Sequence, residues 1–356
     1  MKSNRISLPN TKNSPTYFVA DIAANHDGSL ERAIELIKLA ADSGANAAKF
    51  QNFKASTIVS KRGFDELGQK LTHQSKWKKD VYEVYQDAEL NLDWTNTLIR
   101  TCNENGIDYF TAPYDLDMIN YFSSKMNYFK VGSGDITWKQ SLQLIASKGK
   151  PVLLATGASE LWEVQRAVKT LQNYNIEIII MQCNTNYTGT ENNYDYQNLL
   201  VLNEYSDLFP SAILGLSDHS IGHTAVIGAV ALGARVIEKH FTDDTNRIGP
   251  DHSFSLDPNE WASMVAETRI LERCLGDGHK KIEANEIEAR IVQRRALRYT
   301  QNMQTGSLIS ESDLIALRPC PKNGIDPFNI DKVIGKTLKY DVEIDQLVNE
   351  NDFRSS

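Results

Sequence analysis

The chain has 356 residues, 41% of them hydrophobic and 24% charged, which is the composition of an ordinary soluble globular protein rather than of a disordered or fibrous one. Its 38 basic and 46 acidic residues give a formal net charge of −8, so we expect neither nucleic acid nor another polyanion as a partner. The four widely spaced cysteines form no zinc or redox motif and no apolar run is long enough to span a membrane, which predicts a reduced, cytoplasmic protein without a membrane partner.

Short apolar runs rich in β-branched residues alternate with longer segments of helical periodicity over residues 1–276. Between the first two runs, residues 30–44 place apolar side chains on one helical face and end at a glycine. The alternation predicts repeated βα units, and eight of them match the size of a (β/α)8 TIM barrel, an α/β fold. The expected strands are residues 17–22, 45–50, 107–112, 128–132, 151–155, 176–182, 212–216 and 235–240.

A doubly wound open sheet is the alternative fold, but no glycine-rich dinucleotide fingerprint follows the first strand. Residues 54–90 separate the second strand from its helix, and they predict a long, partly helical excursion over the barrel mouth. After residue 276 the pattern changes to a charged helical linker, 277–296, and then to short strands and turns over 297–356. We expect this last part to be a small second domain that docks on the barrel or on a partner subunit, because its core is small.

Polar residues recur at the C-terminal ends of all eight predicted strands, where TIM barrels carry their catalytic groups. Each of them alone could be a turn residue, a helix cap or a hydrogen-bonded core residue. Their convergence on one rim of the barrel predicts an active site there. The candidates are Asp21, Lys49, Gln51, Thr111, Lys130, Ser133, Asn184, Tyr187, Ser217, His219, His240 and Asp251.

Lys49 and Lys130 lie on strands that the barrel packing would otherwise make apolar, and a buried ammonium is costly unless a negative group meets it. The pair therefore predicts an anionic ligand. With the hydroxyl groups of Thr111, Ser133 and Ser217, the set suits a ligand that carries phosphate and carboxylate. A Schiff-base role for either lysine is the alternative.

His219 and His240 end consecutive strands, which lie about 4.8 Å apart, so both imidazoles can reach one ion. Two histidines with waters and a substrate oxygen suit Mn²⁺ or Mg²⁺ in an open octahedral site. The alternative is that one or both imidazoles only hydrogen-bond to neighbouring main chain.

Segments along the barrel region and the C-terminal region carry a more specific signal. They are ADIAANHDG (20–28), AKFQ (48–51), FTAPYD (110–115), FKVGSGD (129–135), LATG (154–157), GLSDHS (215–220), EKHF (238–241), GPDHSFS (249–255), RRALR (294–298), LRPCPKNGI (317–325) and VIGK (333–336). In this order and spacing they resemble the sialic acid synthase family of N-acetylneuraminate, legionaminate and pseudaminate synthases. The tail is similar to that family's antifreeze-like domain, which is also called the SAF domain and has a β-clip fold.

The resemblance implies a role for each candidate residue. Phosphoenolpyruvate would be held by Lys49, Thr111, Lys130, Ser133 and Ser217. The divalent metal would be bound by His219 and His240, and the sugar would be contacted by Gln51, Tyr187 and Asp251, with Asn184 also binding substrate. Arg318 of the small domain would reach the barrel mouth of the other subunit in a domain-swapped homodimer.

The resemblance further implies a transferase that serves the synthesis of cell-surface polysaccharide. It would condense phosphoenolpyruvate with an N-acetylated hexose and water, giving a nine-carbon 2-keto acid and phosphate. The hexose would be N-acetylmannosamine or a 2,4-diacetamido-trideoxyhexose. The metal would polarise the sugar aldehyde, and Asp21, where the family commonly has Glu, would manage protons near C2 of phosphoenolpyruvate. Ala155 stands where some members have Ser.

Two other functions are open at this point. The first is a barrel aldolase that forms a Schiff base with a keto acid through Lys49 or Lys130 and needs no metal. The second is a binding protein in which the small domain is the functional part and the barrel is a scaffold.

Overall fold

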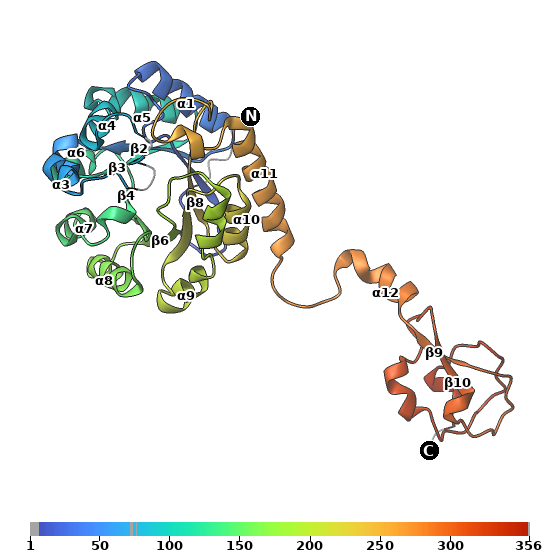
Figure 1. Ribbon diagram of the computed structural model, residues 1–356. Coiled ribbons are helices and arrows are strands. Elements are labelled where there is room, and N and C mark those ends of the chain that lie inside the picture. Colours follow the sequence, from blue (N-terminus) through green and yellow to red (C-terminus); the bar gives the residue numbers. More distant parts are fainter. Residues whose placement is uncertain (1–6, 72–73, 76, 355–356) are drawn as a thin grey trace. The chain divides into compact units, whose positions relative to one another are not determined.

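The computed structural model describes residues 7–71, 74–75 and 77–354. The chain divides into two compact units between Gly276 and Asp277. The first unit is a barrel of parallel strands with helices outside it, and the second is a small, mostly irregular domain with a short antiparallel sheet (Figure 1). No helix within the described residues has the length and apolar character that crossing a membrane requires.

The eight strands of the first unit follow one another around the barrel in the order β3-β2-β1-β8-β7-β6-β5-β4. The two end strands, β3 and β4, pack against each other and nearly close it, so the predicted (β/α)8 barrel is confirmed. Its strands are β1 (Tyr17–Asp21), β2 (Ala47–Asn52), β3 (Asp108–Pro113), β4 (Phe129–Val131), β5 (Val152–Ala155), β6 (Ile178–Cys183), β7 (Ile213–Asp218) and β8 (Val236–His240).

Helices follow the strands and cover the barrel from outside. The first of them begins where Ser29 caps it through a hydrogen bond from the main-chain N–H of Arg32, and it buries its Ala33, Leu36, Ile37 and Ala40 face. The outer helices are α1 (Leu30–Asp42), α5 (Thr95–Glu104), α6 (Leu116–Phe122), α7 (Lys139–Ala146), α8 (Leu161–Gln172), α9 (Val201–Leu208), α10 (Thr224–Ala231) and α11 (Pro258–Leu275).

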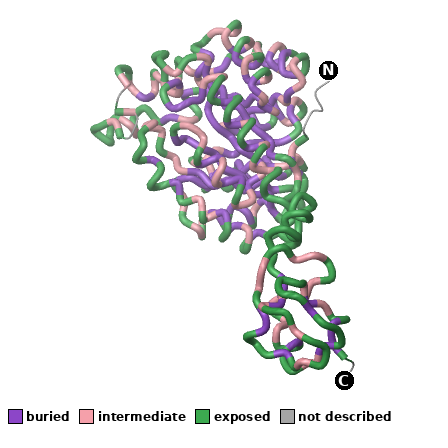
Figure 2. The backbone as a smooth tube through the Cα atoms, turned by 90° about the vertical axis from the view of Figure 1, so that its right-hand side faces the viewer, coloured by how far each residue is buried: buried purple, intermediate pink, exposed green. Residues whose placement is uncertain are grey.

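The barrel interior is a continuous core in which nearly every strand residue is buried (Figure 2). The strands are buried on both faces, because helices cover one face and the barrel centre the other, and this explains their unbroken runs of apolar residues. The buried charged residues of the strands lie in the middle or at the C-terminal end of each strand, and they are Asp21, Lys49, Lys130, Asp218, Glu238 and Lys239.

Among its described residues, the excursion between β2 and α5 contains the short helices α2 (Ala55–Ile58), α3 (Lys61–Glu66) and α4 (Val81–Asp87) and a 3-10 helix, Leu92–Trp94. Asp80 and Glu83 form a reciprocal capping box that fixes the start of α4. Residues of α2 and α4 line the cavity at the barrel mouth, as the sequence predicts for this insertion.

The second unit has a core of its own, made by Leu297, Tyr299, Leu338 and their neighbours. A helix, α12 (Ile287–Gln293), precedes the antiparallel pair of β9 (Ala296–Tyr299) and β10 (Leu314–Leu317), and isolated bridges tie the remaining turns together. This small sheet confirms the predicted second fold.

Candidate active site

A cavity of about 530 Å³ opens at the C-terminal ends of the strands. Its walls come from strand ends, from the loops that follow them and from the β2–α5 excursion. Nine of the residues predicted for the site line it: Asp21, Lys49, Gln51, Lys130, Ser133, Tyr187, Ser217, His219 and His240, with Asp251 as a tenth from the loop after β8.

Two lysines and two carboxylates form the floor of this cavity. The strand register places Asp21 beside both Lys49 and His240, and Lys49 Nζ lies 2.7 Å from Asp21 Oδ2. The ammonium groups of Lys49 and Lys130 each lie 3.4 Å from the same oxygen, Oε1 of Glu238. All of these side chains are at least nine-tenths buried, so two positive and two negative charges balance one another where solvent access is low.

Glu238 is a site residue that the sequence interpretation did not select. It lies two residues before His240 on β8, so the pleat directs both side chains to the barrel interior. Its Oε1 also accepts a hydrogen bond from the Ser217 hydroxyl at 3.2 Å, while its Oε2 is buried without a hydrogen-bond partner among the described residues. The sequence did carry a signal for Glu238: it stands two residues before His240, and alternate residues of a strand point to the same face.

The carboxylates control the charge of Lys49. Burial acts to lower the pKa of its ammonium group, but the neighbouring charges of Asp21 and Glu238 outweigh it and raise the pKa above its usual value. Lys49 therefore stays a cation over the whole physiological pH range.

The two histidines end β7 and β8 side by side, with 5.5 Å between their ring centroids. His219 Nδ1 lies 2.9 Å from the carbonyl oxygen of Asn184, so this nitrogen carries a proton and Nε2 is the nitrogen that the main chain does not engage. Burial acts to lower the pKa of His219, but Cys183 and the Asn184 carbonyl outweigh it and raise the pKa above its ordinary value. Burial, followed by the charges of His219 and Lys49, lowers the pKa of His240 well below its ordinary value, so that ring is neutral. Tyr187 and Phe254 pack against both rings.

The imidazole nitrogens of His219 and His240 are ligands of a kind that divalent metal ions accept. Both imidazoles are buried, and Nδ1 of His240 has no hydrogen-bond partner among the described residues. Across the described ranges no three His, Cys, Asp or Glu side chains are grouped to hold an ion by themselves. The site therefore fits an ion that takes two protein nitrogens and completes its coordination with water and substrate oxygens.

Asp251 and Gln51 lie on the walls of the cavity. Gln51 donates a hydrogen bond to Asp21 Oδ2 at 3.3 Å, and Asp251 Oδ2 accepts one from the main-chain N–H of Ala24 at 3.1 Å. Burial raises the pKa of the Asp251 carboxyl to about 6, and the Ala24 hydrogen bond offsets only part of that rise.

Models of two known families match the chain. The NeuB family matches residues 36–280, and the SAF domain matches residues 294–354. The chain belongs to the NeuB family. This agrees with the resemblance to sialic acid synthases in the sequence analysis, and the SAF match covers the second unit.

Named relatives of this NeuB-family chain are synthases of sialic-acid-type sugars. It is 34% identical to N,N'-diacetyllegionaminic acid synthase of Legionella pneumophila, over 94% of this chain and 93% of the relative. It is 31% identical to human N-acetylneuraminate-9-phosphate synthase, over 94% and 92% of the two chains. Among solved structures, the N-acetylneuraminic acid synthetase of Leptospira borgpetersenii superimposes with a TM-score of 0.69 at 28% identity, over 80% of this chain and 94% of that one.

Three residues that the resemblance selected do not line the cavity. Thr111 is fully buried, and its hydroxyl oxygen lies 2.9 Å from the Phe50 carbonyl oxygen and 2.7 Å from Asn52 Oδ1, so its one proton is donated within the sheet. Asn184 contributes its carbonyl to His219, while its side-chain amide donates to the Tyr196 carbonyl oxygen. Arg318 is exposed on the second unit.

Several side chains that do line the cavity were not among the predicted site residues. Phe53, Tyr85 and Tyr114 form an aromatic wall, with ring centroids 5.4 Å apart for Phe53–Tyr85 and 6.1 Å for Phe53–Tyr114. Asp135 also faces this space, and burial raises the pKa of its carboxyl to about 6, against the nearby charge of Lys130. Aromatic residues near predicted strand ends look like core residues in a sequence, so this wall had no distinct signal.

Proposed function

We propose that the protein is a transferase that condenses phosphoenolpyruvate with an N-acetylated hexose and water, giving a nine-carbon 2-keto acid of the sialic acid type and phosphate. The observation that carries the proposal is the placement of Lys49 and Lys130 beside the His219–His240 pair in one cavity. Two buried ammonium groups and two buried imidazoles in one cavity support a reaction that needs an anionic substrate next to a divalent ion.

The floor of the cavity supports binding of phosphoenolpyruvate. The two ammonium groups each lie 3.4 Å from Glu238 Oε1. An ammonium group has three N–H donors, so each lysine can also donate to a bound anion. Ser217 and Ser133 supply hydroxyl groups on the same floor. Because the lysine side chains are buried, a hydrogen bond from either ammonium group to phosphate or carboxylate would be stronger than it is in solution.

A divalent ion, Mn²⁺ or Mg²⁺, held by His219 and His240 would polarise the aldehyde of the open-chain sugar. The chain's own residues do the rest of the positioning. Tyr187 packs on both imidazole rings and fixes their orientation. Gln51 and Asp251, on the cavity wall, would hold hydroxyl or acetamido groups of the sugar so that the aldehyde carbon faces C3 of phosphoenolpyruvate.

Asp21 would handle the proton transfers of the reaction. When C3 attacks the aldehyde, positive charge develops at C2, and water adds there before phosphate leaves by cleavage of its C–O bond. The Asp21 carboxylate lies at the centre of the floor, with Lys49 at 2.7 Å and the Ala23 N–H at 3.1 Å. These contacts support a role for Asp21 in stabilising that charge and in accepting a proton from the water.

We extend the proposal to the assembly and the setting. A domain-swapped homodimer would bring Arg318 of one chain to the barrel mouth of the other, near the N-acyl group of the sugar. The enzyme would act in the cytoplasm, in the synthesis of a cell-surface polysaccharide.

The Schiff-base aldolase is less well supported. A Schiff-base lysine must lose its proton before it attacks a carbonyl group. The two carboxylates beside Lys49 raise the pKa of its ammonium group, which opposes that loss.

The test is release of inorganic phosphate from phosphoenolpyruvate with Mn²⁺, over a panel of N-acetylmannosamine and 2,4-diacetamido-trideoxyhexoses, each with and without a chelator. We expect release that requires both the sugar and the metal. No release with any sugar would contradict the proposal, and trapping by borohydride with a keto acid would then favour the aldolase.

A further inference from the structure

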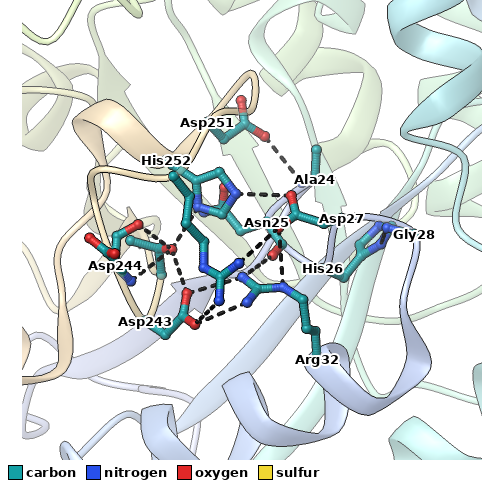
Figure 3. Close-up of polar contacts among 12 residues, drawn as sticks. Ala24, Asn25, His26, Asp27, Gly28, Arg32, Asp243, Asp244, Asp251 and His252 are labelled. Atoms are coloured by element: carbon teal, nitrogen blue, oxygen red, sulfur yellow. Dashed lines mark hydrogen bonds and ion pairs between the residues drawn. The ribbon is translucent and has the colours of Figure 1, made fainter.

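Two loops of the barrel are tied together beside the cavity (Figure 3). One is the turn between β1 and α1, residues 22–29, and the other is the loop between β8 and α11, residues 241–257. The first supplies Ala23 and Ala24 to the cavity wall and the second supplies Asp251. Apart from the short 3-10 helix His252–Phe254 and an isolated bridge between Phe241 and Leu256, the two loops are irregular. Side-chain contacts between the loops therefore help to determine where these wall residues lie.

Main-chain N–H groups of the turn donate hydrogen bonds to two carboxylates of the site, Asp21 and Asp251. Ala23 donates to Asp21 Oδ1 and Ala24 donates to Asp251 Oδ2, each at 3.1 Å. To do so the turn adopts left-handed backbone at two non-glycine residues, Ala23 (φ 45°) and Asp27 (φ 49°). Such residues cost of order 1 kcal/mol each and persist only where surrounding contacts hold them.

Those contacts centre on His252, which is fully buried. Its Nε2 lies 3.0 Å from Asp27 Oδ1 and its Nδ1 lies 2.7 Å from the hydroxyl oxygen of Thr242. A carboxylate can only accept, so Nε2 carries the proton and donates to Asp27, while Nδ1 can accept from Thr242. One imidazole thereby joins the strained turn to Thr242 and His252, the two ends of residues 242–252 in the β8 loop.

A second group of hydrogen bonds also joins these two loops, through Arg32. Arg32, at the start of α1, makes two hydrogen bonds of 3.0 Å to the Asp243 carboxylate and one of 2.9 Å to the Asn25 carbonyl oxygen. The Asn25 amide in turn donates to the Phe241 carbonyl oxygen at 2.9 Å. The main chain on both sides of Asp27 is therefore anchored to the residues just after β8.

We propose that Asp27 and His252 are positioning residues that set the Asp21 and Asp251 carboxylates for the reacting substrates. Neither residue lines the cavity, so they act through the Ala23 and Ala24 N–H groups and through the backbone of the β8 loop. The part of this inference that concerns the sugar rests on the proposed function, because Asp251 is there a sugar ligand. Lys130 and Ser217 lie on other strands, so phosphoenolpyruvate binding depends little on this tie.

The test compares two substitutions of His252, of which only one keeps a hydrogen-bond donor near the position of Nε2. In His252→Gln the side-chain amide keeps a donor near the Nε2 position and can still bond Asp27. In His252→Asn the shorter amide reaches only the Nδ1 position, so the bond to Asp27 is lost. His223→Asn is the matched control, since His223 Nε2 contacts Glu267 at 2.9 Å on the outside of the barrel, away from the cavity.

We expect His252→Asn to raise the KM for the sugar by about 10- to 100-fold and to lower kcat, because a misplacement of about 1 Å can cost that much. The dissociation constant of phosphoenolpyruvate, measured calorimetrically without sugar, stays within about twofold. His252→Gln recovers most of the loss and His223→Asn changes neither constant. Hydrogen exchange at the Ala23 and Ala24 amides becomes faster in His252→Asn only.

The inference is overturned if His252→Asn leaves both the sugar KM and the exchange of these amides unchanged. It is also overturned if kcat falls only in proportion to the folded fraction while every KM stays constant, as a merely structural role predicts. If the wild-type chain releases no phosphate with any sugar, the proposed function fails, whereas the exchange experiment still decides whether His252 holds the turn.

Discussion

The floor of the cavity holds four charges that balance in pairs, and this balance explains how two lysines can be buried. Each ammonium group meets a carboxylate, and Glu238 serves both. Removing one partner of such a cluster leaves an uncompensated buried charge. The consequence can be measured at each residue separately.

Lys130→Met removes an ammonium group while keeping the length and apolar stem of the side chain. We expect the kcat/KM for phosphoenolpyruvate to fall by at least about 100-fold, since a charge-assisted hydrogen bond to the substrate is lost from a desolvated site. Steady-state kinetics with Lys148→Met, whose lysine is half-buried and does not line the cavity, provides the control. Normal affinity and turnover in Lys130→Met would show that the anion binds elsewhere.

Asp251→Asn tests the cost of a buried carboxylate. In the folded chain the pKa of this carboxyl is about 6, above its ordinary value of 3.8, so ionisation destabilises the fold and wild-type stability falls as the pH rises through that interval. We expect the variant to be more stable by about 3 kcal/mol above pH 6, and by progressively less towards pH 4. Denaturant unfolding at both pH values measures this, and sugar KM should rise in the same variant. An equal stability change at both pH values would contradict the assignment.

The site residues that could be predicted from the sequence are charged or polar residues on barrel strands that are otherwise apolar. Lys49, Lys130 and His240 stand out because a charged or polar side chain on such a strand requires a function or a partner. Glu238 follows the same logic but was not selected, because attention to strand ends favoured His240. Thr111 was predicted both from its place at a strand end and from the resemblance, yet its hydroxyl group is hydrogen-bonded inside the sheet.

At the scale of elements, alternation of strand and helix patterns predicted all eight barrel strands, with ends shifted by at most two residues. The 54–90 excursion was predicted as an insertion, but its aromatic wall was not. That wall depends on packing between Phe53, Tyr85 and Tyr114, which lie in three different segments. Contacts of this kind have no local sequence signal.

Gly157, in the loop after β5, shows how closely two of these loops approach. A Cβ atom there would lie 1.9 Å from Thr185 Oγ1 and 2.9 Å from Ser133 Oγ. We expect Gly157→Ala to lower the free energy of unfolding by about 1–3 kcal/mol and to weaken phosphoenolpyruvate binding, because the loops must move apart. Thermal unfolding compared with Gly134→Ala, where a Cβ meets nothing within 4 Å, checks this. Equal stability of the two variants would contradict it.

At the scale of the whole molecule, the chain carries two separate hydrophobic cores. The barrel core draws on no described residue beyond Leu271, and the second core begins at Leu297. The charged segment between them predicted a linker, and the short strands after it predicted a small domain. Where one unit lies on the other, or on a second chain, depends on surfaces that a sequence pattern does not encode.

Separate cores predict that the barrel folds alone. We expect a chain of residues 1–276 to unfold cooperatively and to bind phosphoenolpyruvate with near-native affinity, because Lys49, Lys130 and Glu238 all lie in it. Sugar-dependent turnover should be lost, and Arg318→Ala in the full chain should reproduce much of that loss through the sugar KM. Full turnover by the isolated barrel would contradict the proposed role of the second unit.

The most direct test of the central claim uses phosphoenolpyruvate labelled with ¹⁸O in its bridging oxygen, incubated with metal, sugar and enzyme. We expect the released phosphate to carry the label, because the C–O bond breaks, and one equivalent of 2-keto acid to form with it. Phosphate that lacks the label, or a labelled keto acid, would contradict attack of water at C2 and with it the role assigned to Asp21 and the lysine floor.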